Sequence, residues 1–399
     1  AGKDGKAYSI KPTDGTGDFT FSRGSNLAAT RVGPTGLIEK GRENLILQSN
    51  QFDTTWGTTS SISLTSSQSG YDGTNNAWLL ERTGTGGQRL FQNISSSGVQ
   101  TFSVYAKANV GDWLLLYIYT SGGDYTQWYN LSNGSLGASG VNIDASIESV
   151  GNGWFRCSLT FTGTTIDVRI YPVDGNGSIF GTNESIYIQD AQLEVGLAAT
   201  DYIESGATTG KAGLLEDEPR FDYSGGATCP SLLLEPSRTQ LLHYSEYFGA
   251  WSANAGGISS IEPNYAISPE GVENAYKVNF VVQGDTDLAL VRGHSVTGGS
   301  TYAYSIYIKG EGSNIGKDIV VKSKRSGGDF AGTTTFQTLT GEWQRIDFTT
   351  TYAANNTGGN LYISSNDATS CLIYGAQAEL GSYATSYIPN HSGGTITRG

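Results

Sequence analysis

Short stretches in which apolar and polar residues alternate recur along the whole chain. They read FSVYAKA at 102–108, TIDVRIYPV at 165–173 and SIYIQDAQLEV at 185–195. Alternation with a period of two marks a β-strand that has one buried face and one face in water. Few stretches contain the long runs of strong helix formers that helices need. The pattern therefore predicts an all-β protein.

The stretch TIDVRIYPV shows what this alternation implies for single residues. We expect Ile166, Val168 and Ile170 on the buried face of that strand, and Asp167 and Arg169 on the wet face. Between such strands lie loops rich in Gly, Asn, Ser and Asp, which favour turns. With 55 glycines among 399 residues and only 15% charged residues, the composition fits many short strands joined by turns.

Two long segments of the chain each occur twice, in similar form. AQLEVGLAATDYI at 191–203 matches AQAELGSYATSYI at 376–388, and LIEKGRENLILQSNQF at 37–52 matches LLEPSRTQLLHYSEYF at 233–248. We infer two copies of one domain, because the matching segments follow in the same order in both halves. Domains of this length and strand pattern are usually two-sheet sandwiches, commonly jelly rolls. The opening and closing segments are expected to pair and to seal each sandwich.

The repeat divides the chain into five parts. We predict an N-terminal anchoring arm at 1–40, a first β-sandwich at 41–206, a linker or entry arm at 207–236, a second β-sandwich at 237–391 and a C-terminal tail at 392–399. The arm is the natural anchor because it lies outside both copies. The tail is polar and rich in glycine, so it is expected to leave the second sandwich.

Several charged, amide and tryptophan positions recur in both copies. We predict that they are structural anchors of the repeat: Glu39, Arg42, Glu235, Arg238, Trp154, Trp343, Gln192 and Gln377. Glu39 is expected to pair with Arg42, and Glu235 with Arg238, to fasten the entry arms. The alternative is a catalytic pair of carboxylates, but positions present in both copies mostly report the fold.

A cluster of aromatic residues occurs only in the first copy, mostly within DWLLLYIYTSGGDYTQWYN. Flat rings can stack on the apolar face of a sugar, and neighbouring Asn, Asp and Gln side chains can bind its hydroxyls. The candidates for a glycan site are Trp113, Trp128, Tyr117, Tyr119, Tyr125 and Trp78. The alternative is that these rings fill the core of the first sandwich.

The sequence offers little for metal or cofactor chemistry. The three histidines lie far apart, and neither a zinc-hydrolase nor a serine-hydrolase motif is present, so we assign no catalytic residue. No organic cofactor is predicted. Asp190 and Glu194, in the first closing strand, are candidates for holding a structural Ca²⁺, which prefers oxygen ligands.

The charge balance narrows the range of partners. The formal net charge is −13, which disfavours nucleic acid because phosphate binding needs a basic surface. No apolar run approaches the roughly 18 residues of a membrane span, so no membrane partner is expected.

Segments that frame nearly the whole chain resemble bacteriophage virion fibre and head-spike proteins, which carry tandem jelly rolls of the carbohydrate-binding-module type. These segments are YSIKPTDGTGDFTFSRGSNLAATRV at 8–32, GLLEDEPRFDYSGG at 213–226, SLLLEPSRTQLLHYSEYFGAW at 231–251 and the two endings that begin AQLEVG and AQAELG. The resemblance implies a homo-oligomeric protein of the virion surface, made in the host cytoplasm. It would contact other virion proteins through residues 1–40 and bind a host surface glycan.

Three hypotheses of function follow from these observations. The first is a non-enzymatic virion structural protein, such as a capsid decoration, a head fibre or a tail fibre, that displays two jelly-roll modules for adhesion to the host. The second is a dedicated carbohydrate-binding protein, for which a virion location is incidental. The third is a polysaccharide-degrading enzyme, which would release reducing ends from host capsule.

Overall fold

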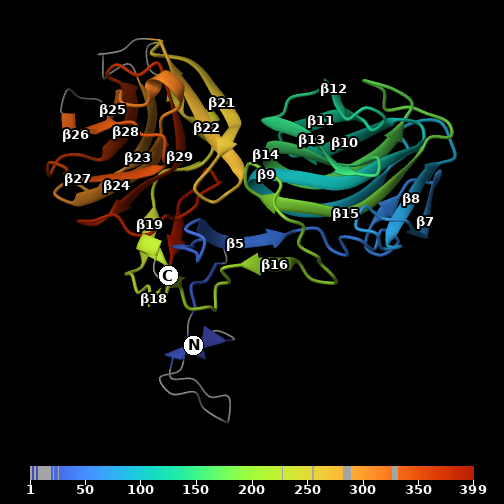
Figure 1. Ribbon diagram of the computed structural model, residues 1–399, viewed down its shortest axis with the longest axis horizontal. Helices are drawn as coiled ribbons and strands as arrows, with labels where there is room; N and C mark the ends of the chain where they lie inside the picture. The colour runs from blue at the N-terminus through green and yellow to red at the C-terminus, as the bar shows by residue number, and fades with distance from the viewer. Residues whose placement is uncertain are drawn as a thin grey trace. The chain divides into compact units, whose positions relative to one another are not determined.

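The regular structure of the chain is almost entirely β-strand (Figure 1). The computed structural model describes residues 2–3, 6–7, 19–20, 22–25, 27–226, 228–253, 256–281, 289–325 and 331–399. Within these ranges the helices are short 3-10 turns at Ser224–Gly226, Phe248–Ala250 and Gly312–Asn314, and no helix is long and apolar enough to span a bilayer. The predicted all-β sandwich class is confirmed.

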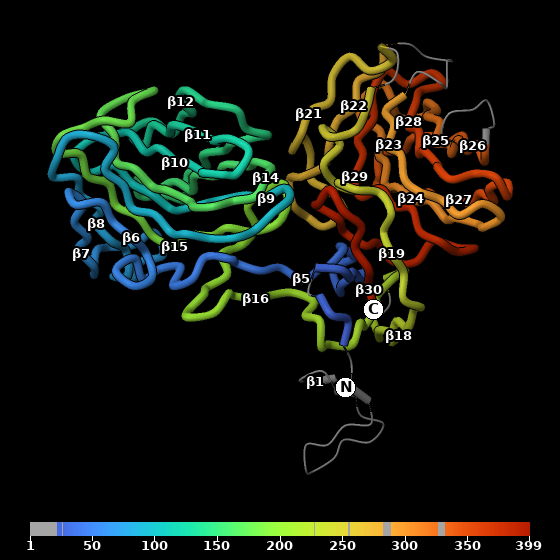
Figure 2. The backbone as a smooth tube through the Cα atoms, turned by 180° about the vertical axis from the view of Figure 1, so that it is seen from behind, coloured from blue at the N-terminus to red at the C-terminus, as the bar shows by residue number. Residues whose placement is uncertain are grey.

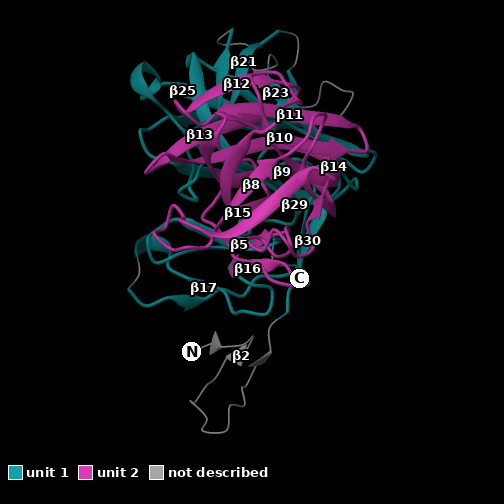
Figure 3. Ribbon diagram, turned by 90° about the vertical axis from the view of Figure 1, so that its right-hand side faces the viewer, with its two compact units in different colours: residues 1–42, 213–399 teal, residues 43–212 magenta. Residues whose placement is uncertain are grey.

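The described chain divides into two compact units (Figure 3). Residues 43–212 form one, called the inserted unit, and residues 1–42 and 213–399 form the other, called the split unit. The chain passes into the inserted unit within β5 (Ile38–Asn44) and returns within β16 (Gly210–Gly213), as Figure 2 shows. The two sandwiches are therefore nested in sequence, whereas the repeat predicted two consecutive domains behind a separate arm.

The inserted unit is a two-layer sandwich made from one sheet that folds over itself. Its strands are β6 (Gly57–Thr58), β7 (Ile62–Gln68), β8 (Ala77–Arg82), β9 (Leu90–Val110), β10 (Trp113–Thr120), β11 (Gly123–Asn130), β12 (Ser135–Ser139), β13 (Asp144–Gly151), β14 (Trp154–Val173) and β15 (Ser185–Val195). The long strands β9 and β14 run through both layers and turn where Gly98 faces Gly163. Both glycines have positive φ, which a residue without a Cβ adopts at little cost. Phe102, Leu116 and Ile170 belong to the enclosed apolar core.

The split unit contains two five-stranded sheets with the orders β20-β23-β28-β25-β26 and β21-β22-β29-β24-β27. Their strands are β20 (Ser252–Ala253), β21 (Ile258–Ile267), β22 (Glu273–Phe280), β23 (Leu290–Ser295), β24 (Thr301–Lys309), β25 (Asp318–Arg325), β26 (Ala331–Thr338), β27 (Gln344–Thr351), β28 (Gly358–Ser365) and β29 (Ser370–Leu380). Short strands complete the unit: β1 (Gly2–Lys3), β2 (Lys6–Ala7), β3 (Phe19–Thr20), β4 (Thr30–Val32), β17 (Phe221–Asp222), β18 (Ser231–Leu232), β19 (Arg238–Gln240) and β30 (Ile396–Arg398).

Each sandwich is sealed where its opening and closing segments meet, which confirms the pairing that the repeat predicted. In the inserted unit the Leu45 amide donates to the Leu193 carbonyl at 2.7 Å. In the split unit the Leu241 amide donates to the Ala378 carbonyl at 2.9 Å. The duplicated opening and closing segments of the sequence thus form the two ends of each sandwich.

A buried asparagine, Asn44, joins the opening and closing segments of the inserted unit through hydrogen bonds. The side-chain Nδ2 of Asn44 donates to the carbonyls of Ala191 and Ile203, and its Oδ1 accepts from the amides of Ile46 and Leu193. All four hydrogen-bonding positions of the amide are therefore used.

Gln240 repeats this arrangement in the split unit. Its Nε2 donates to the carbonyls of Ala376 and Ile388, and its Oε1 accepts from the amides of Leu242 and Ala378. Both side chains satisfy backbone groups that leave water when the sandwich closes, and such groups are costly when they stay unpaired.

The predicted anchors Gln192 and Gln377 lie beside these two amides. Gln192 accepts a hydrogen bond from the Ile203 amide at 2.7 Å and donates to Glu194 at 2.7 Å. Gln377 makes the equivalent pair of bonds in the split unit. The repeated Ala-Gln-x-Glu motif therefore belongs to the closure of each sandwich.

The predicted tryptophan anchors have different degrees of burial. Trp154 is almost fully buried beside the rings of Tyr71 and Tyr187. Trp343 packs at the edge of a small cluster of buried residues, and its indole N–H donates to the Ile267 carbonyl at 3.0 Å. Both therefore fasten strands to neighbouring segments.

The structure does not form the ion pairs that we expected within the entry arms. The charged partners are instead Arg31 for Glu39, Glu270 for Arg42, Arg220 and Arg398 for Glu235, and Glu379 for Arg238. Glu39 and Arg42 lie three residues apart along β5 and therefore point to opposite faces, which separates this expected pair.

The C-terminal segment does not leave the split unit. Strand β30 pairs with β19, and the side chain of Arg398 is fully buried, where its guanidinium lies 3.2 Å from Glu235. The predicted free tail at 392–399 is therefore wrong, because the charge at its end has a partner inside the unit.

The later part of the predicted anchoring arm at 1–40 also belongs to the split unit. Strand β4 pairs with β5, and Ile38 is buried in a cluster with Tyr374 and Tyr387. This part of the arm does not project as an anchor. Residues 1, 4–5, 8–18, 21 and 26 of the predicted arm lie outside the described residues.

Lys40 of β5 carries its charge into the core of the split unit. Its ammonium lies 3.3 Å from Glu246 and 3.0 Å from Glu270, and all three side chains are more than nine-tenths buried. Burial lowers the pKa of Lys40, but the two carboxylates outweigh it, so the net effect is a raised pKa. Tyr387 and His391 also contact Glu246. The pair of Lys40 and Glu246 joins residues 206 positions apart in sequence.

Replacing Lys40 by methionine should weaken the split unit by about 3–5 kcal/mol, because two buried carboxylates lose their central cation. Hydrogen exchange followed by mass spectrometry should show faster exchange in peptides from β22 and β29 and unchanged exchange in peptides from β9. Lys211→Met, at an exposed position of β16, is the matched control. Equal protection of β29 in both variants would contradict this account.

Candidate functional site

One face of the inserted unit gathers aromatic and charged side chains from neighbouring strands. Strands β11, β10, β14 and β9 lie side by side in that order. Leu114 and Leu116 of β10 point into the core. Because side chains alternate along a strand, Trp113, Leu115 and Tyr117 point outward from the same sheet. We call this outward surface the aromatic face.

The strand register brings the rings of the aromatic face together. Leu115 lies opposite Trp128 of β11 on one side and Tyr171 of β14 on the other. These three residues and Val173 form a buried apolar cluster, and the half-buried rings of Trp113 and Tyr117 pack against it. The face is therefore a platform of rings carried by three paired strands.

Charged groups border these rings. The Arg169 guanidinium lies 4.7 Å from the ring centre of Tyr117 and 5.0 Å from that of Tyr119, and it pairs with Asp167. The Tyr117 hydroxyl donates to Asp124. Burial, followed by this hydrogen bond, raises the pKa of Tyr117 to about 12, so the phenol remains neutral at physiological pH.

A backbone carbonyl fixes the tryptophan at the centre of the platform. The indole N–H of Trp128 donates to the Ser178 carbonyl at 2.6 Å, and only 8% of the residue is exposed. By contrast, 40% of Tyr119 is exposed at the edge of the face. The buried Trp128 therefore supports the half-buried rings of Trp113 and Tyr117 from behind, and these two rings supply the accessible apolar surface.

Two predicted glycan-site residues do not reach this face. Trp78 belongs to the core of the inserted unit, where its ring meets that of Phe52 and its N–H donates to the Asn50 carbonyl. Tyr125 of β11 packs against the same core. For these two residues the alternative interpretation, core filling, is the one that the structure supports.

Sequence reasoning missed two members of the aromatic face, Tyr171 and Arg169. The alternation in TIDVRIYPV placed Arg169 correctly on the wet side, but its role beside the rings needed the register of β10. The same alternation placed Ile166 on the wrong side. The register shifts between Thr165 and Asp167, so 40% of Ile166 is exposed.

The split unit carries different chemistry on the corresponding sheet. Lys322 of β25 lies opposite Tyr362 of β28, with its ammonium 5.6 Å from the ring centre. Phe336 of β26 is 58% exposed and lies opposite Val320. The platform of several rings is therefore a feature of the inserted unit.

The geometry gives no support to the predicted Ca²⁺ site. Asp190 accepts a hydrogen bond from the Tyr71 hydroxyl at 2.9 Å, and Glu194 accepts from the amide and the hydroxyl of Thr200 at 2.9 and 2.6 Å. These donors occupy oxygens that a cation would need. Within the described ranges, no group of three or more His, Cys, Asp and Glu side chains is placed to hold a metal ion.

Comparison with known proteins finds structural likeness without a sequence match. No protein-family model and no curated protein matches the chain. Similar solved structures include a carbohydrate-binding module described as CBM4 (16% identity, 33% of this chain and 100% of that chain, TM-score 0.24). Another is the CBM22-1–CBM22-2 tandem domain of Xyn10C from Paenibacillus barcinonensis (11% identity, 90% and 100% coverage, TM-score 0.26).

A third similar structure is the enzymatically active domain of tailspike protein 4 from bacteriophage CBA120 (9% identity, 35% of this chain and 20% of that chain, TM-score 0.26). At these TM-scores the likenesses carry no argument about function. The functional interpretation therefore rests on the aromatic face itself.

Burial raises the pKa of Asp190 to about 6, which gives the inserted unit a specific pH dependence. The unfolded chain releases this proton near pH 4, so between about pH 4 and 6 the folded state binds more protons. Stability from this group is present below pH 4 and is lost as pH rises through 6. Relative to Asp190→Asn, the wild type should lose about 3 kcal/mol between pH 3.5 and 7.

Urea unfolding followed by tryptophan fluorescence measures this difference, since five of the seven tryptophans lie in the inserted unit. Asp201→Asn, at an exposed position, is the control and should follow the wild-type curve. A constant gap between wild type and Asp190→Asn at every pH would contradict the assignment.

Proposed function

We propose that this protein binds carbohydrate through the aromatic face of the inserted unit. The observation that carries the proposal is the pair of half-buried rings of Trp113 and Tyr117, which the buried Trp128 supports and which Asp124 and Arg169 border. Such rings stack on the apolar face of a sugar, while polar groups at the rim bind its hydroxyls.

The charges around the platform favour an uncharged sugar. Asp124, Asp167 and Arg169 together leave one negative charge on this face, and the whole chain carries a net charge of −13. An acidic glycan would be repelled by both. We therefore propose a neutral oligosaccharide or polysaccharide as the ligand.

No chemical step is proposed at this face. Glycoside hydrolysis needs one carboxyl group that donates a proton and a second that attacks the sugar or activates water. Asp124 accepts the Tyr117 hydroxyl, and Asp167 is paired with Arg169, so both carboxylates are engaged. Release of reducing ends from a bound polysaccharide by the purified protein would contradict a purely binding role.

A place on a virion, homo-oligomer formation and contacts with other virion proteins remain predictions from the sequence resemblance. In that setting the two sandwiches would act as an adhesin for a host surface glycan. A density map of the phage particle, with mass spectrometry of its proteins, tests this location separately from sugar binding.

Trp113→Ala should lower affinity for a neutral glycan by about tenfold or more, because a stacking ring is lost while the buried cluster remains. A glycan array that includes cellohexaose, xylohexaose, laminarihexaose and maltohexaose, with hexagalacturonic acid as an acidic comparison, identifies the ligand. Isothermal titration calorimetry then measures the loss.

Phe336→Ala, which removes an exposed ring from the split unit, is the matched control and should bind as the wild type does. Equal losses in both variants, or no binding to any glycan of the array, would overturn the proposal.

A further inference from the structure

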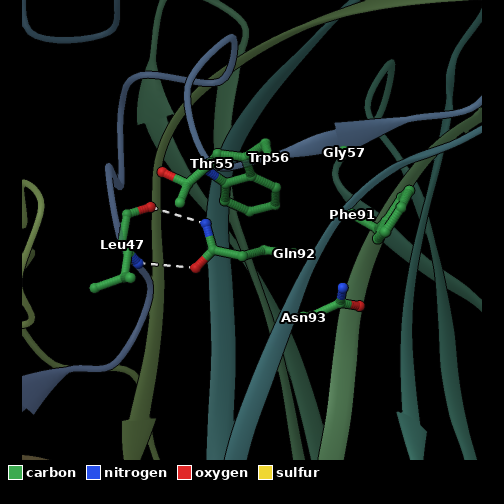
Figure 4. Close-up of a pocket in the computed structure, with 7 residues that line it drawn as sticks. All are labelled: Leu47, Thr55, Trp56, Gly57, Phe91, Gln92 and Asn93. Atoms are coloured by element: carbon green, nitrogen blue, oxygen red, sulfur yellow. Dashed lines mark hydrogen bonds between the residues drawn. The ribbon is translucent and has the colours of Figure 1, made fainter.

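A pocket of about 370 Å³ opens in the inserted unit beside the start of β9 (Figure 4). Trp56 and Phe91 supply aromatic walls, and Thr55 and Asn93 supply polar ones. The volume lies within the range of small-molecule sites, and the lining combines apolar walls with a few polar groups, as such sites do.

The inner wall of the pocket is fixed by hydrogen bonds. The Gln92 side chain accepts from the Leu47 amide and donates to the Leu47 carbonyl, both at 2.8 Å, as the dashed lines in Figure 4 show. The Trp56 indole N–H donates to the Gln48 carbonyl at 3.2 Å, and its ring lies 5.2 Å from that of Phe52. These groups hold the wall in place before any ligand arrives.

Two polar groups of the pocket are exposed and available. Neither the Asn93 amide nor the Thr55 hydroxyl makes a hydrogen bond with another described side chain or backbone group, and both residues are exposed. Thr55 also has a φ of +70°, an uncommon and strained conformation for a β-branched residue. Such strain is often found at binding sites.

A glycine controls the shape of the pocket. A Cβ added at Gly57 would lie 2.5 Å from Cζ of the Phe91 ring, so the ring can rest on the backbone there only because a side chain is missing. Any larger residue at this position would push the Phe91 ring from its place.

The pocket continues the aromatic face. Phe91 and Asn93 of β9 lie opposite Arg169 and Asp167 of β14, and Arg169 in turn touches Tyr117. From Tyr117 on β10 to Phe91 on β9 the track crosses two strand spacings, about 10 Å. A ligand that follows this track is longer than one sugar ring.

We propose that the pocket binds the terminal sugar of a neutral glycan whose following units lie across the aromatic face. The protein would thus recognise the end of a chain, with Phe91 stacking on the last ring and Asn93 and Thr55 bonding its hydroxyls. This proposal rests on the proposed function, because the remaining units need the aromatic face.

The test compares three variants for binding of the four neutral hexasaccharides by calorimetry. Gly57→Val, which displaces Phe91, and Asn93→Ala should each lower affinity by about tenfold for the hexasaccharide that binds the wild type. Gly87→Val, where an added Cβ meets nothing within 4 Å, is the control and should have no effect. Circular dichroism checks that each variant is folded.

Two further measurements address the chain end directly. The first uses the side-chain amide signals of Asn93 in NMR spectra, which are assigned by their loss in Asn93→Ala. These signals should shift when methyl β-D-glucopyranoside or methyl β-D-xylopyranoside is added. The same shift should occur in Trp113→Ala, which keeps the pocket. Longer chains of the bound sugar should compete equally per mole of chains, since each chain offers one such end.

The outcomes separate the two proposals. If Trp113→Ala loses binding while Gly57→Val and Asn93→Ala bind as the wild type does, the pocket proposal falls and the function of the aromatic face stands. Competition that grows with chain length, or Asn93 signals that do not move, also overturns chain-end recognition. If no hexasaccharide binds the wild type, both proposals fall.

Discussion

The architecture depends on satisfying backbone hydrogen bonds where each sandwich closes. There the first and last strands meet away from water, and unpaired amides and carbonyls would cost more than the contact gains. Asn44 and Gln240 resolve this with one amide each, which uses both of its donor positions and both acceptor positions. Because each sandwich has the same requirement, the closing segment with its Ala-Gln-x-Glu motif occurs in both.

The same constraint leaves the sheet faces free to differ. Equivalent residues close each of the two sandwiches. The outward-facing side chains of the sheets are not needed for this closure, so they can differ between the units. On the inserted unit such a row became a platform of rings around Trp128. On the split unit the corresponding sheet carries a buried Lys322 beside Tyr362 and an exposed Phe336. The chain thus has two scaffolds of one kind, and one of them carries the rings on which the proposed sugar binding rests.

The sequence revealed the duplicated β-sandwich, its closure and most of the aromatic face, because all three depend on local alternation or on repetition. The grouping of aromatic residues used closeness in sequence and not the face of each strand, so it included Trp78 and Tyr125, which belong to the core. A register shift at Ile166 breaks the alternation without any local sign. The burial of Lys40 depends on Glu246, 206 residues away, and no local pattern contains that information.

Nesting one sandwich within the other also has a consequence for engineering. The Thr209 hydroxyl donates to Glu43 at 2.5 Å, so the chain enters and leaves the inserted unit at neighbouring points. A module whose ends adjoin can be spliced into a surface loop of an unrelated carrier without stretching the recipient. The neighbouring ends of the inserted unit therefore suit it for transfer, as a whole domain, into a loop of another protein.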